Sequence, residues 1–378
     1  MENTSTAFAE NTFENIKGTS AVISTEPRKV AWSGVEGCRS FSTPVTVSEA
    51  VKAVGADYEV EKRHMVAISD ELYRAIMDGT PITETTFNEE DIVPSHCATV
   101  RADRGNILGV VGSNYGVANN SMTLDFFNRI LNGNNDAGER AVIETAGVLN
   151  RGGRFYISAK MPETVQIDGD NSPINDYILL TNDHRGYGGV TVCFTGVRVV
   201  CQNTLNVALK LARNKLSYQH TSRIGERMDL SDDMNVARVN QILFEHRSYK
   251  LAMVEDLKRL REIRISDQKD VLDLVCRVFA DDKEMEAIRN EYYRFDKLDA
   301  EVLSQRKKNL IHSLMDSVES GIGQDTNRGT GLWMYNGITT WANNGKQYKD
   351  GEKKFDAIWG GDVSRKVQKM HDMVLEYV

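Results

Sequence analysis

The feature that most constrains this chain is a series of short apolar runs joined in pairs by glycine-containing turns. Residues 98–102 and 107–111 flank Asp-Arg-Gly-Asn, residues 142–149 and 155–159 flank Arg-Gly-Gly, and residues 177–181 and 190–200 flank the segment 182–189. Because Asp, Asn and Gly tolerate the backbone angles of tight turns, each pair predicts a β-hairpin. Apolar residues alternate with Thr and Cys in the last strand, which is typical of a sheet with one buried face. Repeated hairpins favour an antiparallel sheet over a doubly wound one.

The second half of the sequence has a helical pattern. Beyond residue 234, starting near Val239, apolar residues recur at three- and four-residue spacing among charged ones. In the first half, Thr46 and Glu49 fit a capping box, and residues 122–131 have the spacing of a second helix. We therefore predict an α+β chain: an antiparallel β-hairpin sheet with packed helices in the N-terminal half, followed by a mainly α-helical C-terminal half.

The same patterns divide the chain into three expected segments. Residues 1–28 are polar and predict a loosely ordered arm, residues 29–230 an α+β core domain, and residues 231–378 a helical domain. We expect the helical domain to pack on itself within the monomer, with an oligomer or partner surface as the alternative.

The sequence indicates a cytoplasmic protein without a membrane partner. No run approaches the ~18 to 20 apolar residues that span a bilayer, and the N-terminus lacks the basic and apolar regions of a secretory signal. The five cysteines form no C-x-x-C pair, so we expect free thiols rather than disulfides.

Charge is distributed unevenly along the chain. The net charge is −8, yet the stretch between His184 and Gly225 contains no Asp or Glu. A helix predicted over residues 203–212, with Asn203 as its N-cap, would carry basic residues away from its apolar stripe. Such a row would neutralise phosphates, and exposed tyrosines would stack on unpaired bases. The predicted nucleic-acid-binding residues are Arg185, Arg198, Lys210, Arg213, Lys215, His220, Arg223 and Arg227, with Tyr187 and Tyr218 for stacking. A solvated face that balances the acidic remainder explains the row equally well.

Several ordered blocks resemble the phage/plasmid-like family, a group of unknown function common on mobile elements. They are residues 196–205 (GVRVVCQNTL), 100–115 from an Arg-Asp hairpin to Gly-x-x-Tyr, 145–154 with TAG and GG, 179–186 with Asn-x-His-x-Gly, His220, and 331–341 (GLWMYNGITTW). The chain departs from the family at Ser33, where relatives often carry His, and at Gln219, where they carry Arg. The resemblance implies a mobile-element origin and no particular reaction.

Catalytic and metal-binding patterns are weak. There is no P-loop, and the glycines of residues 186–189 join two strands, which indicates a hairpin turn rather than a dinucleotide fingerprint. The aspartates of residues 168–176 favour a solvated turn, because the later glycine and glutamate of a calcium loop are missing. Asp183 and His184 are expected in an exposed polar turn, with an acid/base pair as the alternative. We predict no catalytic residue, no metal and no cofactor.

We therefore predict a non-catalytic DNA-transaction protein of a phage or other mobile element, which binds or anneals single-stranded DNA or mediates recombination. Antiparallel hairpins backed by a basic helix are similar to the plan of RecT-like annealing proteins. These work as oligomers, and the C-terminal helices would supply the contacts. One alternative is an interaction factor that sequesters a host protein, since the acidic charge would suit mimicry of nucleic acid. The other is a divergent metal-dependent nuclease using Asp168, Asp170 or Asp176.

Overall fold

A computed structural model describes residues 22–24, 38–40, 45–81, 87–132, 141–167, 173–198, 204–205, 215–229, 231–321, 324–349, 351–359 and 361–377. Its strands are β1 Val22–Ser24, β2 Cys38–Ser40, β3 Val60–Val66, β4 Ile92–Arg101, β5 Ile107–Gly112, β6 Val142–Leu149, β7 Arg154–Val165, β8 Ile174–Asp183, β9 Val190–Arg198, β10 Thr204–Leu205 and β11 Lys215–Tyr218. Its helices are α2 Val47–Ala53, α3 Asp70–Met77, α4 Asn120–Asn132, α5 Ile224–Met228, α6 Asp233–Glu262, α7 Gln268–Phe279, α8 Asp282–Asn290, α9 Gln305–Ser320, α10 Gly331–Thr340, α11 Gly351–Trp359 and α12 Asp362–Leu375. Short turns include η3 Glu89–Asp91, η4 Asn150–Gly152 and the π-helical η9 Trp341–Gly345. The α+β prediction is confirmed.

The centre of the molecule is an eight-stranded sheet in the order β10-β9-β8-β7-β6-β1-β2, with β11 also paired to β9. Strands β6 to β9 follow one another as an antiparallel meander, which confirms the second and third predicted hairpins. The first predicted hairpin lies in a separate three-stranded sheet, β3-β4-β5. Val190, Val192 and Phe194 of β9 are buried whereas Thr191 and Cys193 are half-buried, as their alternation predicts.

Local capping signals in the first half are confirmed. The Oγ1 of Thr46 accepts a hydrogen bond from the backbone N–H of Glu49 at 3.2 Å, and the Glu49 carboxylate accepts one from the N–H of Thr46 at 2.8 Å. These reciprocal bonds satisfy donors that the first turn of α2 would otherwise leave free. Gly55 adopts φ +61° just beyond the helix, a conformation that costs glycine little.

The helix predicted over residues 203–212 is wrong where the structure describes that stretch. Thr204 and Leu205 form β10, which pairs antiparallel with Val197 and Gly196 of β9. A helix capped by Asn203 would need helical backbone from Thr204 onward, whereas pairing with β9 holds that backbone extended. The other residues of the predicted helix lie outside the described residues.

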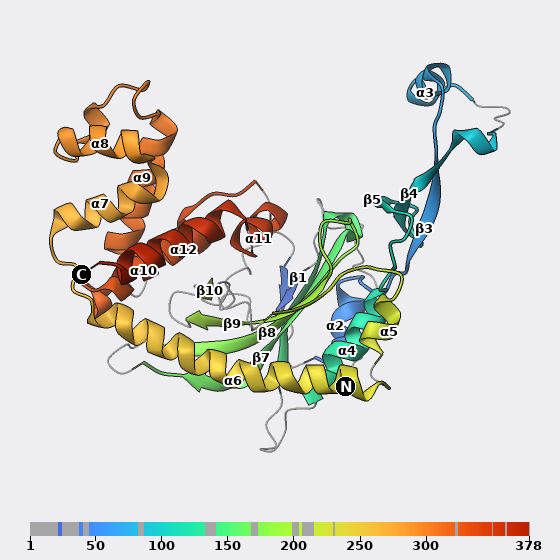
Figure 1. The fold of residues 1–378 in the computed structure, drawn as a ribbon, viewed down its shortest axis with the longest axis horizontal. Helices are drawn as coiled ribbons and strands as arrows, with labels where there is room; N and C mark the ends of the chain where they lie inside the picture. Colours follow the sequence, from blue (N-terminus) through green and yellow to red (C-terminus); the bar gives the residue numbers. More distant parts are fainter. Residues whose placement is uncertain are drawn as a thin grey trace.

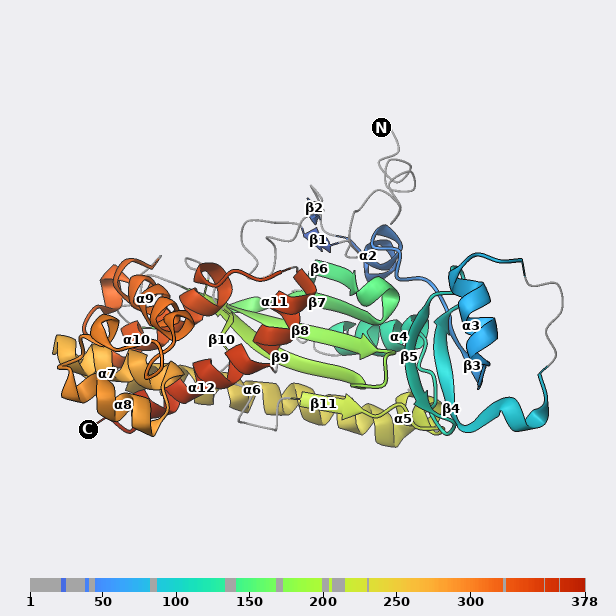
Figure 2. The ribbon, with the colours of Figure 1, turned by 90° about the horizontal axis from the view of Figure 1, so that it is seen from above.

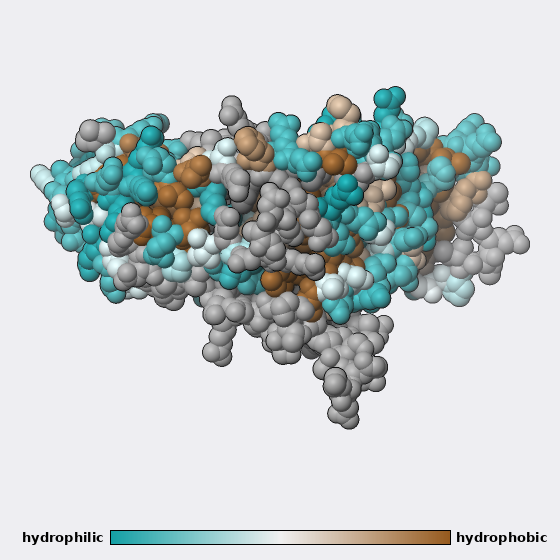
Figure 3. Space-filling model, turned by 90° about the horizontal axis from the view of Figure 1, so that it is seen from below, coloured by the Kyte–Doolittle hydropathy of each residue, from teal (hydrophilic) through white to brown (hydrophobic). Residues whose placement is uncertain are grey.

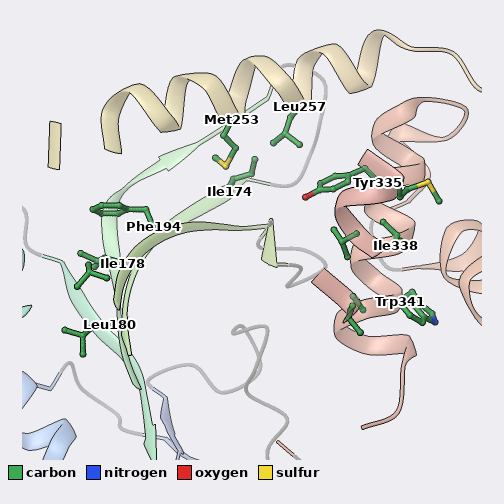
Figure 4. Packing of buried hydrophobic residues seen from close by; sticks show 14 of the residues in the cluster. Ile174, Ile178, Leu180, Phe194, Met253, Leu257, Tyr335, Ile338 and Trp341 are labelled. Carbon is green, nitrogen blue, oxygen red and sulfur yellow. The ribbon is translucent and has the colours of Figure 1, made fainter. Parts of the chain in front are cut away.

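Helices cover both sides of the large sheet. In Figure 1, α6 runs beneath the sheet and α11 and α12 lie above it; Figure 2 shows α12 crossing over the strands. Most of β8 is accordingly buried. Figure 4 shows Met253 and Leu257 of α6 facing Ile174 of β8, and all three are buried. Helix α6, which begins the C-terminal half, therefore shares a hydrophobic core with the large sheet.

Helix α10 lies inside the C-terminal half, in contact with α6, α9 and α12. Every residue of this helix is buried, including Tyr335 and Ile338, which appear in Figure 4. A Cβ at Gly337 would lie 2.3 Å from the Cγ2 atom of Val318 in α9, so glycine permits this close approach of two helices. The helical half packs on itself around this buried helix.

The small sheet and α3 project from the rest of the molecule as an arm, at the upper right of Figure 1. We use "the arm" for the described residues between Val60 and Arg101. Its stem is the antiparallel pair β3–β4, from Val60 opposite Arg101 to Val66 opposite Ile92. On the face of the molecule in Figure 3, hydrophilic residues surround separate groups of apolar ones.

Candidate functional site

The turns of the predicted hairpins meet at one place, which we call the turn cluster. It comprises Tyr58, Arg101, Asp103, Tyr115, Asn120, Arg154, Asn182, Asp183, His184, Arg185 and His220. The backbone N–H of His184 donates to the carbonyl of Gly153 at 2.8 Å, and the Thr99 hydroxyl donates to the carbonyl of His184 at 2.8 Å. The Tyr58 hydroxyl donates to the carbonyl of Gly152 at 2.6 Å. These bonds join the β8–β9 turn to η4 and to the small sheet.

Asp183 holds two arginines of the cluster. Its carboxylate accepts from Nε and Nη2 of Arg185 at 2.9 and 2.7 Å and from the same atoms of Arg154 at 3.0 and 2.8 Å. Arg154 also pairs with Asp356 of α11. Burial alone would raise the pKa of Asp183, but the hydrogen bonds from Arg185 and the charge of Arg154 hold it at about 2. The carboxylate is therefore ionised at neutral pH and fixes both guanidinium groups.

Two histidines and two asparagines form a buried network beside Asp183. The Nδ2 atom of Asn182 donates to the carbonyl of Ala118 at 2.9 Å and to Oδ1 of Asn120 at 3.1 Å. The Nε2 atom of His220 lies 3.1 Å from Oδ1 of Asn182, and that of His184 lies 3.1 Å from Oδ1 of Asn120. The Nδ1 atom of His220 also lies 3.1 Å from the carbonyl oxygen of Gly116, so both ring nitrogens of this imidazole face oxygen acceptors.

Burial favours the neutral form of both histidines. It lowers the pKa of His184 to about 3, with the neighbouring His220 adding to the effect. It also lowers the pKa of His220, against the opposing influence of the Gly116 carbonyl and of Asp183. The Nδ1 atom of His184 has no hydrogen-bond partner among the described residues. With no exposed surface on His184, the pair serves to join chain segments rather than to exchange protons with a substrate.

The prediction that Asp183 and His184 lie in an exposed polar turn is wrong. Asp183 is 3% exposed and His184 is fully buried. The reason is a non-local one: residues 116–120, β5 and η4 pack around this turn. A Cβ at Gly109 of β5 would lie 2.4 Å from the carbonyl oxygen of Arg185. Only a glycine at this position therefore lets β5 pack this closely against the turn.

Aromatic rings complete the cluster. Tyr115 stacks on His220 with ring centroids 4.8 Å apart. The guanidinium carbon of Arg101 lies 3.9 Å above the centroid of the Tyr58 ring, a cation–π geometry, and its Nε and Nη2 donate to Asp103 at 2.7 and 2.9 Å. Burial raises the pKa of Tyr58 to about 12, so its hydroxyl stays protonated as a donor.

One predicted stacking residue lies open at this site. Tyr187 is 87% exposed at the tip of the β8–β9 turn. The guanidinium carbon of Arg185 lies 5.7 Å from its ring centroid, and Asp183 fixes that guanidinium. Gly186, between the two, adopts φ +87°. Tyr187 therefore offers an aromatic face next to a fixed positive charge.

The other predicted binding residues fall into different environments. Tyr218 is 4% exposed and packs edge to face on Phe126, and His220 is 6% exposed within the buried network, so neither presents a face to a ligand in this structure. Arg223 is the N-cap residue of α5 and Arg227 lies in its last turn, and both are exposed.

Four predicted residues are placed only in part or not at all. Arg198 ends β9 and Lys215 begins β11, and the side chains of both lie outside what the structure describes. Lys210 and Arg213 lie outside the described residues. The structure thus joins Arg185, Tyr187 and His220 in one region.

Sequence reasoning missed the arginines of the other turns. The dipeptide Arg-Gly occurs in all three predicted turns, as Arg104-Gly105, Arg151-Gly152 and Arg185-Gly186. The three glycines all have positive φ: +69°, +105° and +87°. Arg151 is exposed and Arg104 is partly so, with 35% of its side chain accessible. The recurrence of Arg-Gly in the three turns was the sequence signal that could have pointed to these arginines.

Metal and membrane features are absent from the described part of the chain. None of its side chains form a group of three or more His, Cys, Asp or Glu able to hold a metal ion. Asp176 is buried in β8 rather than in a solvated turn, while Asp168 and Asp170 lie outside the described residues. Among the described helices none is long and apolar enough to cross a bilayer. Cys97, Cys193 and Cys276 carry free thiols, as expected.

Comparison with known proteins adds a family assignment. The model of a domain of unknown function, DUF932, matches residues 107–359, about two thirds of the chain. The match includes η4, the β8–β9 turn and His220 of the turn cluster. No curated protein and no solved structure matches the chain.

Proposed function

Because the chain belongs to the DUF932 family, whose function is unknown, its activity has to be argued from its own site, and we propose that it is a non-catalytic single-stranded DNA-binding protein. The observation that carries this proposal is Tyr187, an almost fully exposed aromatic ring on a turn made rigid by the Asp183 ion pairs. An unpaired base of any kind can stack on a rigid, exposed aromatic ring.

The charge around Tyr187 supports contact with phosphates. The turns and their strand ends carry the arginines at 101, 104, 151, 154 and 185, against the aspartates at 103, 183 and 356. Five positive and three negative side chains leave an excess of two positive charges in a chain with a net charge of −8. Local fields rather than net charge decide where a polyanion binds.

Two further exposed arginines follow β11, next to the exposed Glu226 and Asp229. β11 pairs with β9 so that Tyr218 lies opposite Val190, directly after the turn that bears Tyr187. The chain then continues to Arg223 and Arg227, which are exposed. In this proposal, phosphates of a strand bound at Tyr187 would contact Arg151 of η4 and Arg223 of the segment after β11. Each phosphate neutralised in this way releases counterions, which favours binding at low salt.

We assign no reaction to this surface, because the titratable groups of the turn cluster are buried or held in ion pairs. The resemblance of residues 179–186 and 196–205 to the phage/plasmid-like family supports a role on a mobile element, which would act in the cytoplasm. By analogy with RecT-like annealing proteins, an annealing role would involve an oligomer. Phe244 and Leu251 support one through the C-terminal helices, because both are exposed and lie two turns apart on α6.

The proposal is tested by comparing two exposed tyrosines. Tyr292 is 81% exposed and lies 5.9 Å from the guanidinium carbon of Arg294, so it matches Tyr187 in exposure and in its arginine neighbour. We expect Tyr187→Ala to weaken binding of a fluorescein-labelled single strand by ~5- to 150-fold, the equivalent of ~1 to 3 kcal/mol per stacked base. Tyr292→Ala should bind as the unsubstituted protein does. Equal affinities of the two variants, or no binding by the unsubstituted protein at low salt, would refute the proposal.

A further inference from the structure

The helix at the end of the arm is amphipathic but has no buried residue. α3 begins after Ser69, whose Oγ accepts from the N–H of Leu72 at 3.2 Å. Tyr73, Ile76 and Met77 are 55%, 49% and 67% exposed. A helix of eight residues is well below the ~12 to 15 that an isolated helix needs in water, so most of its stability has to come from packing. Within the described residues, no other element buries this apolar face.

Other large apolar residues near α3 are exposed as well. The N–H of Ala67 donates to the carbonyl of Asp91 at 2.7 Å, which brings the residue before Ile68 next to η3. Ile68, Phe87 and Ile92 are each more than 40% exposed on these two segments. We call the described residues 67–81 and 87–92 the arm tip. Several large apolar side chains close together are unusual on a monomer and mark interaction sites.

The charged residues of the arm tip are mainly carboxylates. The arm tip contains six acidic residues, at positions 70, 71, 78, 89, 90 and 91, and one basic residue, Arg74. Five of the acidic residues are exposed, and the sixth, Asp91, is half-buried. Its formal charge is therefore −5, the opposite of the basic surface around Tyr187.

We propose that the arm tip is a docking site for a cationic amphipathic helix of a partner protein. The apolar side of such a helix would bury Tyr73, Ile76 and Met77, as helix pairs do when their side chains interdigitate. Its lysines and arginines would face the acidic residues, which speeds encounter and rejects acidic partners. The tip of a second copy carries the same −5 charge and would be repelled. An anionic membrane surface would be repelled for the same reason.

The probe for this site is a fluorescein-labelled synthetic helix of about fifteen residues, with Leu at helical spacing and Lys elsewhere. We expect the full-length protein to bind it saturably and less tightly as salt is added. Ile76→Ser/Met77→Ser should weaken binding by ~10-fold or more, since two apolar contacts are lost and the charge of the arm tip is unchanged. Ile107→Ser is the matched control, because Ile107 is also exposed, at 71%, but lies on β5 away from α3. The control should bind as the unsubstituted protein does.

Four results would overturn the proposal: no saturable binding, equal loss in the control, unchanged binding in the α3 variant, or equally tight binding of the same helix with Glu in place of Lys. Sedimentation velocity and flotation with anionic vesicles test the other occupants. Self-association or vesicle binding that the α3 substitutions abolish would assign the tip to a second copy or to lipid instead. Because no α3 residue is buried, the substitutions should leave the thermal unfolding midpoint unchanged, and a melt identifies any variant that misfolds.

Discussion

Replacing Asp183 by Asn tests whether ion pairing holds the turn cluster together. The carboxylate is 4% exposed, and its partners Arg154 and Arg185 are 18% and 15% exposed. Asn keeps the shape of the side chain but removes the charge. It leaves two guanidinium groups facing a neutral amide at a site with little exposure to solvent, while the ion pair between Arg154 and Asp356 is kept.

The structure sets the size of the expected effect. Removing one partner of a buried ion pair costs about 3 to 5 kcal/mol, and the exposure of the arginines places this site near the lower end. The pKa of Asp183, about 2 against 3.8 for an unperturbed carboxyl, gives about 2 to 3 kcal/mol by linkage. We expect Asp183→Asn to lower the free energy of unfolding by about 3 kcal/mol.

The assay is urea unfolding followed by circular dichroism near neutral pH. Asp362→Asn is the matched control, because Asp362 also pairs with two basic side chains, Arg365 and Lys366, but is 67% exposed. Its loss should cost less than about 1 kcal/mol. Because the pKa of Asp183 is lowered, its contribution is present above about pH 4 and is lost as the pH falls toward 2, where the gap between variant and unsubstituted protein should narrow. A cost for Asp183→Asn equal to that of the control would refute the argument.

Three other substitutions follow from the same contacts. Burial lowers the pKa values of His184 and His220, so the free energy of unfolding should fall as the pH drops below about 6.5, by up to ~1.4 kcal/mol per pH unit for each histidine. The double variant His184→Gln/His220→Gln should flatten this slope in urea titrations. An unchanged slope would contradict the neutrality of the two histidines. Burial acts to lower the pKa of His371, but the carboxylate of Asp256, 2.6 Å from its Nε2 atom, outweighs burial and raises it. The pair therefore stabilises the folded protein at low pH, and this contribution is lost as the pH rises through the pKa that His371 has in the folded state. Asp256→Asn should therefore cost more near about pH 6 than near about pH 9, and a pH-independent cost would exclude the pair. Gly153→Ala would place a Cβ 2.7 Å from Cγ of Arg185 and should cost ~1 to 3 kcal/mol in thermal melts, whereas Gly112→Ala, with nothing within 4 Å, should be nearly neutral.

Signals that act over a few residues predicted the structure well. The capping box of Thr46 and Glu49 and the turns of the β6–β7 and β8–β9 hairpins are formed as their sequences indicate. In each case the residues that carry the signal make the hydrogen bonds themselves, or adopt the backbone angles themselves. The helix expected after Asn203 shows the limit of this reasoning, because pairing of Thr204 and Leu205 with β9 outweighs a local N-cap signal.

The composition of the turn cluster could not be read from local patterns. Asn120, Asn182 and His220 belong to segments up to a hundred residues apart, and only the packing of the two sheets brings them together. The same packing buries His184, whose neighbours in sequence are those of a solvated turn. The Arg-Gly dipeptides were visible in the sequence, but their convergence depends on strand order, which the dipeptides do not encode.

The salt dependence of single-strand binding tests the central proposal most directly. A labelled strand of about 30 nucleotides is titrated with the unsubstituted protein and with Arg151→Ala/Arg223→Ala/Arg227→Ala at several salt concentrations, by fluorescence anisotropy. If these exposed arginines contact phosphates, affinity falls steeply with salt, and the slope of log affinity against log salt is shallower in the triple variant by about 0.7 per lost contact, or about 2 in all. Identical slopes for the two proteins, or no binding at the lowest salt, would contradict a nucleic-acid site around Tyr187.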